Sequence, residues 1–280
     1  MKYLCKLLKM RIHLIIFSIL AAGMFTGCEY QKVLKKGSLE QKLDVARKYY
    51  NKGDYARAEI MLDQLLGKFP RGGNAEEVYF LYSYCHYGMN EYALASYHFQ
   101  NYVERYPNTK YTEQAAFMVA KCAYAGSLAS ELDQTETKKA IEAIQLFINK
   151  YSQSELVEQS NELIDELRAR LHSKALSKAE LFYKMENYLA AYTTYKNAIA
   201  TYPDLPNKTM ASFYMVKSSF LYAKQSVKEY QLERYTKAFN EATEFLVEYP
   251  EHKKKDEIND LKERCTNLID KLKTEETTSK

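Results

Sequence analysis

Apolar residues recur at intervals of three and four positions along most of the chain. Leu62, Leu65 and Leu66 follow this spacing, and Ile144 and Ile148 repeat it further along. Residues at this spacing share one face of an α-helix, whereas a half-buried strand alternates apolar and polar positions. No stretch shows a convincing alternation, and the 280 residues include only 9 Gly and 5 Pro. The pattern therefore predicts an all-α protein with long helices and short turns.

One frame of residues occurs five times along the chain. An alanine is followed eleven positions later by an aromatic residue, and the next position is Pro in four copies and Ser152 in the third. In four copies a tyrosine also lies three positions before the alanine. The alanines of the five copies are Ala58, Ala95, Ala140, Ala191 and Ala238. A fixed frame of this kind predicts internal structural repeats.

Each recurring residue type has its own role in packing two helices. Small residues let the helices of one unit approach closely, the aromatic residue fills the space toward the next unit, and proline ends the helix. The frame resembles the tetratricopeptide repeat, lengthened by insertions around residues 126–137 and 224–232. We therefore predict a tetratricopeptide-type solenoid of about five helix-turn-helix repeats.

The repeats predict how the chain is organised. Repeats one to three are expected over residues 38–153. Residues 154–273 are expected to hold a long connecting helix, repeats four and five, and a polar capping helix over 256–273. Residues 274–280 are expected to form a disordered tail.

The first 27 residues have the features of a secretory signal. Residues 1–11 are basic, and residues 12–22 form an apolar run shorter than the ~20 residues that cross a bilayer. Small residues then precede Cys28, and this order resembles the bacterial lipoprotein signal, in which such a cysteine becomes the lipidated first residue. We expect Cys28 to carry the lipid, palmitate included, and residues 28–37 to form a short linker. An ordinary cleaved signal and a transmembrane anchor are the alternatives.

Charge and motif content narrow the function classes. Four of the 40 basic residues lie in the first 27 residues, which contain no acid, so 36 basic residues face 36 acidic ones in the remainder. A neutral chain has no electrostatic footprint for nucleic acid. The sequence also lacks phosphate-loop, dinucleotide, nucleophile-elbow and zinc-protease motifs. We expect no enzyme activity, no cofactor and no metal, and we expect the scattered histidines to have packing or surface roles.

The cysteines give no disulfide framework. Three remain after Cys28, namely Cys85, Cys122 and Cys265, and they include no CxxC pair. Cys85 and Cys122 occupy equivalent positions in adjacent repeats. Two buried small residues are favoured over a disulfide between them.

Tyrosine is the most informative residue type, with 26 copies. The first helix of each repeat lines the concave surface of such a solenoid, and tyrosine offers a ring and a hydroxyl with few torsions to restrict. Packing between helices is the alternative role for each candidate, and Tyr50 and Tyr87 are expected to be the most exposed. The candidate groove residues are Tyr50, Phe80, Tyr84, Tyr87, Phe117 and Tyr124.

A lipoprotein signal joined almost directly to five such repeats and a polar C-terminal helix resembles the BamD family of outer-membrane protein assembly factors. Residues 49–55 with Ala58, and residues 106–111, carry the resemblance most clearly. It implies a lipid-anchored scaffold at the periplasmic face of the outer membrane, within the β-barrel assembly machinery. It also implies that the N-terminal repeats bind unfolded β-barrel substrates and that the C-terminal repeats bind the BamA-like central barrel subunit.

A periplasmic repeat adaptor of the Tol and cell-wall coordination type is the alternative. Such adaptors resemble this chain in their repeats but typically carry a coiled-coil segment before them. Only nine residues separate Cys28 from Ser38, which leaves no room for a coiled coil.

Overall fold

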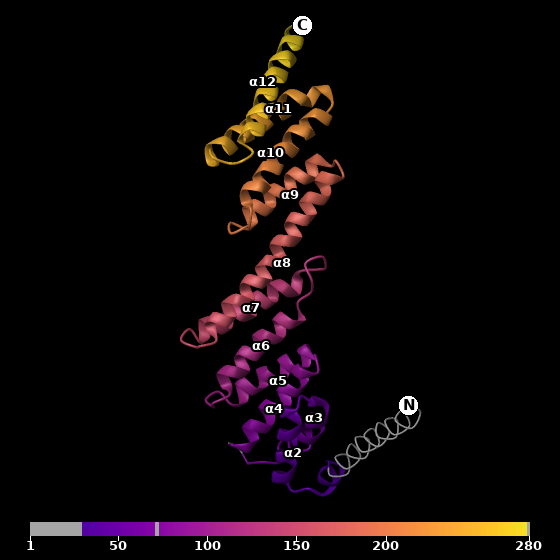
Figure 1. The fold of residues 1–280 in the computed structure, drawn as a ribbon, viewed down its shortest axis with the longest axis vertical. Helices are drawn as coiled ribbons and strands as arrows, with labels where there is room; N and C mark the ends of the chain where they lie inside the picture. The colour runs from indigo at the N-terminus through magenta and orange to yellow at the C-terminus, as the bar shows by residue number, and fades with distance from the viewer. Residues whose placement is uncertain (1–29, 71–72, 279–280) are drawn as a thin grey trace, which may run out of the picture. The chain divides into compact units, whose positions relative to one another are not determined.

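The computed structural model describes residues 30–70 and 73–278, and this part of the chain contains helices and no strands. The all-α class that the apolar pattern predicts is confirmed. The helices are α2 (Leu39–Asn51), α3 (Tyr55–Asp63), α4 (Asn74–Gly88), α5 (Tyr92–Arg105), α6 (Thr112–Gly126), α7 (Thr135–Lys150), α8 (Val157–Lys184), α9 (Tyr188–Thr201), α10 (Lys208–Gln225), α11 (Lys228–Glu248) and α12 (Lys255–Thr278). Figure 1 shows them along the chain.

The chain divides into two compact units. Among the described residues, the first unit holds 30–127 and 135–164, and the second holds 128–134 and 165–278. In the first unit each helix from α2 to α7 packs on the next one in sequence, and in the second unit the helices from α9 to α12 do the same. This is the helical-repeat arrangement that the frame predicts. The division falls between Ile164 and Asp165 inside α8, the long connecting helix expected to join the two groups of repeats.

The recurring alanines lie in the buried core between helices. All five are fully buried, with 0% of their surface exposed; they are Ala58, Ala95, Ala140, Ala191 and Ala238. A side chain this small lets two helix backbones approach each other, as the sequence frame predicts. Larger side chains fill the space around these contacts, with Phe99 and Tyr102 in the first unit and Phe213 and Ile258 in the second.

The turn between paired helices is repeated as well. Gly53, Asn90 and Glu186 each lie two positions before the helix-starting tyrosine and have φ values of 75°, 64° and 58°. In each turn, the amide of this residue donates to the carbonyl three positions earlier, and the next amide donates to the carbonyl five positions earlier. Glycine adopts a positive φ without steric cost and asparagine tolerates it, whereas glutamate is strained there.

Two segments at the ends of the repeats differ from expectation. Residues 30–36, expected to belong to a linker, form a helical segment, and Tyr30 within it is 6% exposed. Residues 274–278, expected to be disordered, continue α12 to Thr278. In these last turns Glu275 pairs with Lys228 of α11 at 2.7 Å and with Lys271 of its own helix at 4.0 Å. Cys28 and the signal segment lie outside the described residues.

We predict that Gly88→Ala destabilises the first unit. A Cβ at Gly88 of α4 would lie 2.3 Å from the Cδ2 atom of the Tyr55 ring, so the ring or the helix has to move. The expected loss in the free energy of unfolding is about 1–3 kcal/mol, measured by urea denaturation. Gly126→Ala is the matched control, because Gly126 also ends a helix and a Cβ there meets nothing within 4 Å. Equal stability of the two variants would contradict this contact.

Candidate functional site

Four of the candidate groove residues come together in the first unit. Tyr84 of α4 is at the centre, with ring centroids 5.5 Å from Tyr50 of α2, 6.2 Å from Phe80 and 5.8 Å from Tyr87. Most of these rings meet edge to face, an arrangement that attracts through the ring quadrupoles. The tyrosines of adjacent repeats therefore form one connected aromatic row.

Burial separates these candidates into two groups. Phe80 and Phe117 are each only 4% exposed. Phe80 stacks on Tyr111 at 4.7 Å, and packing, the alternative role, describes it best. The four tyrosines of the set are partly exposed, so the surface that these candidates offer is made of tyrosine; they are Tyr50, Tyr84, Tyr87 and Tyr124.

Burial also determines the protonation state of the tyrosine hydroxyl groups in the row. It raises the pKa of Tyr50, Tyr84 and Tyr87 above the ordinary value for tyrosine. At neutral pH these groups are protonated and can donate hydrogen bonds. The row therefore offers apolar rings and neutral donors rather than charge.

A surface depression of about 480 Å³ adjoins the row. Its lining comes from Tyr84 of α4, from α6 and the residue Lys110 before it, and from residues 155–159 at the start of α8. Phe117 borders the depression despite its burial. The Lys121 ammonium lies 5.9 Å from the centroid of the Phe117 ring. The lining residues are Tyr84, Lys110, Glu113, Gln114, Phe117, Met118, Lys121, Glu155, Leu156 and Gln159.

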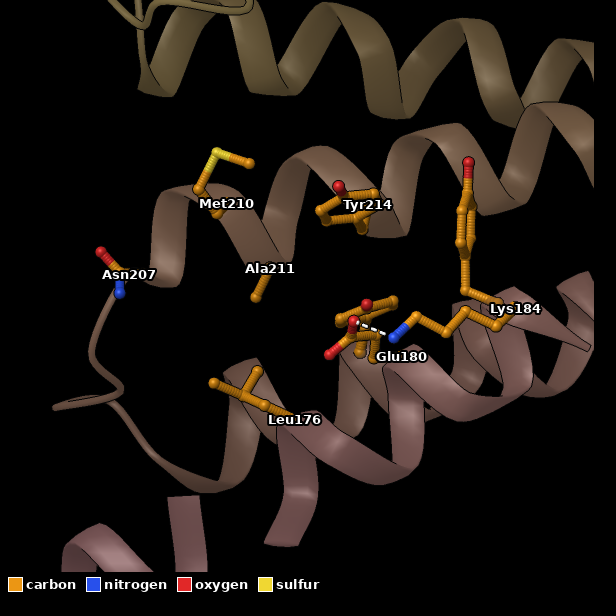
Figure 2. Close-up of a pocket in the computed structure, with 9 residues that line it drawn as sticks. Leu176, Glu180, Lys184, Asn207, Met210, Ala211 and Tyr214 are labelled. Carbon is orange, nitrogen blue, oxygen red and sulfur yellow. Dashed lines mark ion pairs between the residues drawn. The ribbon is translucent and has the colours of Figure 1, made fainter. Parts of the chain in front are cut away.

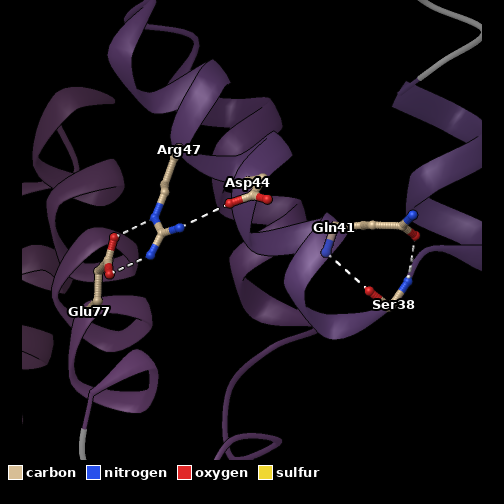
Figure 3. Close-up of polar contacts among 5 residues, drawn as sticks. All are labelled: Ser38, Gln41, Asp44, Arg47 and Glu77. Carbon is tan, nitrogen blue, oxygen red and sulfur yellow. Dashed lines mark hydrogen bonds and ion pairs between the residues drawn. The ribbon is translucent and has the colours of Figure 1, made fainter.

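We use the word seam for the space between the first helices of two successive repeats. The seam between α2 and α4 is bridged by paired charges. Nε and Nη2 of Arg47 donate to the two carboxylate oxygens of Glu77 at 2.6 and 2.7 Å, and Nη1 donates to Asp44 at 3.0 Å (Figure 3). The hydrogen bond from Arg47 lowers the pKa of Glu77 despite partial burial of the carboxyl. A bidentate ion pair therefore bridges the seam between α2 and α4, whereas the seam between α4 and α6 contains the depression beside Tyr84.

The second unit has its own depression, of about 360 Å³, between α8 and α10. Figure 2 shows Leu176 on one side and Met210 and Ala211 on the other, with the gap between them. Tyr214 lies with its ring 5.9 Å from Tyr195 and 5.2 Å from Tyr183, and these rings line the same space. The pocket is therefore largely aromatic and apolar.

Charged groups at this second pocket are already paired. Glu180 and Lys184 form an ion pair at 2.6 Å along the edge of the pocket (Figure 2).

Another ion pair of the second unit lies between α10 and α12. Lys217 of α10 pairs with Glu257 of α12 at 2.8 Å, and this hydrogen bond lowers the pKa of the Glu257 carboxyl. The α10–α12 seam is thus bridged by charge, like the α2–α4 seam in the first unit.

Two histidines that the sequence analysis treats as scattered form a pair. His86 of α4 and His98 of α5 stack with ring centroids 5.1 Å apart, and Nδ1 of His86 lies 2.6 Å from a Glu91 oxygen. Both lie six positions from Tyr92, and this symmetry about the turn is the signal that could have revealed the pair. Burial, and then the neighbouring His86, lowers the pKa of His98.

Within the described residues no group of three or more His, Cys, Asp and Glu side chains could hold a metal ion.

The cysteines pack as small apolar residues. Cys85, Cys122 and Cys265 are buried and free. Burial raises the pKa of each thiol to about 12. The interpretation of Cys85 and Cys122 as core residues is confirmed.

Comparison with known proteins gives the family. The model of the outer membrane lipoprotein family YfiO matches residues 37–231. The chain belongs to this family. The match runs from the residue before the α2 N-cap into α11 and so includes both depressions. No curated protein matches the chain.

Two solved structures are similar to this chain over most of their length. The yeast histone chaperone Hif1, described as a scaffold protein, is 15% identical, with 84% of this chain and 94% of that chain covered and a TM-score of 0.27. The assembly chaperone of RpL4, Acl4, is 12% identical, with 86% and 99% covered and a TM-score of 0.28. These scores carry no conclusion about the function of this YfiO-family chain.

Across 30–70 and 73–278, no helix combines the length and apolar character needed to cross a membrane.

We predict that Arg47→Gln weakens the first unit in a pH-dependent way. The pKa of Glu77 is lowered in the folded state, so its stabilising effect is present above the unfolded value of about 4.5 and is lost as the pH falls through the folded value. At pH 7 the variant should lose about 1–2 kcal/mol of unfolding free energy, because the pair is only partly shielded from solvent.

Chemical denaturation at pH 7 and at pH 3 measures this difference. Lys139→Gln is the control, since Lys139 forms an exposed ion pair with Glu136 of its own helix, and its loss should be close to the limit of detection. A deficit of Arg47→Gln that is as large at pH 3 as at pH 7 would show that the ion pair is not its cause.

Proposed function

We propose that this protein is a non-catalytic scaffold of the β-barrel assembly machinery, acting in the manner of BamD at the periplasmic face of the outer membrane. The observation that carries the proposal is the match to the outer membrane lipoprotein family over residues 37–231. The position of Cys28 after a signal-like segment supports acylation of that residue. The acyl chains would hold the protein at the membrane surface.

The first unit is proposed to receive the C-terminal segments of unfolded β-barrel proteins. Its depression supports this role by combining aromatic rings with charged groups of both signs. An apolar or aromatic side chain of the substrate would contact Tyr84 and Phe117. Lys110 and Lys121 would bind the terminal carboxylate, and carboxylates such as Glu113 would accept hydrogen bonds from peptide N–H groups.

The second unit is proposed to dock on the central, BamA-like subunit. Its pocket between α8 and α10 is lined mainly by aromatic and aliphatic side chains, the residue types that anchor protein interfaces. A bulky side chain of the partner would enter between Met210 and Leu176. The two proposed roles therefore use separate pockets in separate units.

We predict that affinity capture of the native protein from detergent-solubilised envelopes recovers the central barrel-assembly subunit. Quantitative mass spectrometry identifies the captured proteins. A variant carrying Met210→Glu should lose this partner, because it introduces an unpaired charge into an apolar pocket. Recovery of Tol-system or cell-wall synthesis proteins instead would move the function to the repeat-adaptor alternative.

We predict that Lys110→Gln combined with Lys121→Gln weakens binding of a peptide with an aromatic C-terminal residue and a free carboxylate by about tenfold, or ~1.4 kcal/mol. Fluorescence anisotropy measures the affinity. The same peptide with an amidated C-terminus should bind the native protein about as weakly, and the double substitution should weaken it no further. Equal losses for both peptides would exclude carboxylate recognition by these lysines.

The aromatic row is tested separately. Replacing Tyr50 and Tyr87 together with Ala should weaken both the free and the amidated peptide, since ring contacts do not depend on the carboxylate. Tyr50→Phe with Tyr87→Phe is the matched control that keeps the rings. Unchanged peptide binding by a folded double-alanine variant would remove these tyrosines from the site.

A further inference from the structure

The helical segment at residues 30–36 has two chemically different faces. Tyr30, Val33 and Leu34 lie on one side and pack against the core of the first unit. Lys32, Lys35 and Lys36 fall on the opposite side at helical spacing and are exposed. The segment is therefore an amphipathic helix whose solvent face is basic.

Tyr30 fastens this segment to the first repeat. Its ring meets Tyr49 of α2 edge to face with centroids 5.0 Å apart, and its hydroxyl donates to the backbone carbonyl of Arg57 in α3 at 3.1 Å. The guanidinium of Arg57 lies 5.5 Å from the centroid of the same Tyr49 ring. The segment thus touches both helices of repeat one.

A fixed corner joins the segment to α2. The amide of Gly37 donates to the carbonyl of Val33 at 2.8 Å, and a Cβ at Gly37 would lie 2.6 Å from that same oxygen. Ser38 then caps α2: its side chain accepts from the Gln41 amide, and the Gln41 side chain accepts from the Ser38 amide (Figure 3). The direction of the basic face is therefore set by the body of repeat one.

The charge of this face is uncompensated along the segment. No acidic residue occurs between Tyr30 and Leu39. Among the described residues, no ion pair involves Lys32, Lys35 or Lys36. The acidic groups that act on the Tyr30 hydroxyl, Asp54 and Glu59, do so on the packed side of the helix.

The position of the face in the chain indicates its partner. Tyr30 follows Cys28 by two residues, and two residues span at most about 7 Å. A residue acylated at position 28 therefore holds the start of the helix close to the lipid headgroups. Electrostatic attraction to a charged membrane reaches about 8–10 Å at physiological ionic strength.

We propose that Lys32, Lys35 and Lys36 form a contact surface for anionic phospholipid headgroups, which sets the orientation of repeat one on the membrane. This inference rests on the proposed acylation of Cys28 for its location, but the lysines should recognise anionic lipid without the acyl chains. The lipid anchor would supply proximity, and the basic face would supply direction.

The test uses the mature chain, residues 28–280, with Cys28→Ala to remove acylation. Binding to vesicles of phosphatidylcholine with about 30% phosphatidylglycerol is measured by co-sedimentation at about 50 mM and about 500 mM NaCl, which brackets the range over which salt screens surface charge. We expect binding at low salt, its loss at high salt, and weak binding to pure phosphatidylcholine. Each lysine near an anionic surface contributes about fivefold, so replacing all three with Gln should weaken binding on the order of 100-fold.

The matched control removes the same charge elsewhere, with Lys224, Lys253 and Lys255 of the second unit changed to Gln. This variant should bind within about twofold of the parent, because its lysines lie outside the proposed contact surface. Equal losses in the two triple variants, or vesicle binding that is independent of salt and of anionic lipid, would overturn the proposal.

Circular dichroism and thermal unfolding establish that both variants keep their fold. Capture of the central subunit by the lysine variant is scored separately, so the scaffold role can fail or succeed independently.

Discussion

Close contact between paired helices at fully buried alanines is the constraint on which the rest of this structure depends. Side chains as small as those of Ala58 and Ala95, both fully buried, let the two helices of a pair pack directly against each other. Neighbouring pairs then pack through the second helix of one pair and the first helix of the next, α3 on α4 and α5 on α6. Successive first helices leave seams beside these contacts, and the side chains along each seam decide whether it is bridged or open. In the proposed function, both ligands therefore bind at seams between repeats.

The seams differ in a simple way. Arg47 with Glu77 in the first unit, and Lys217 with Glu257 in the second, bridge seams near the ends of the repeat series with paired charges. Tyr84 and Tyr214 line the open ones. A charged bridge resists entry because a ligand would have to replace both partners. Aromatic rings present no such barrier, which is why the proposed function places both ligands at tyrosine-lined seams.

Local periodicity in the sequence is enough to predict the repeat architecture. The alanine frame, the turns at Gly53 and Asn90, and the core role of Cys85 all depend on spacing within one repeat.

Contacts between helices are beyond the reach of that periodicity. The pairing of His86 with His98 depends on how two helices face each other. The packing of Tyr30 depends on an aromatic contact 19 residues away in Tyr49, with no repeated frame to indicate it. Helical spacing gives the face of a residue but not the depth at which it lies, so the sequence leaves both roles open for Phe80, which is buried in the structure.

Burial of the cysteines changes the reactivity of their thiols when the chain folds. With thiol pKa values of about 12, Cys85 and Cys122 hold almost no thiolate at neutral pH, and thiolate is the species that attacks disulfides and oxidants. Once the chain is folded, these two thiols react slowly in thiol–disulfide exchange at neutral pH. Before folding, the same thiols have ordinary reactivity and lie on consecutive repeats. Packing of α4 and α6 into the core is therefore the step that withdraws both thiols from disulfide exchange.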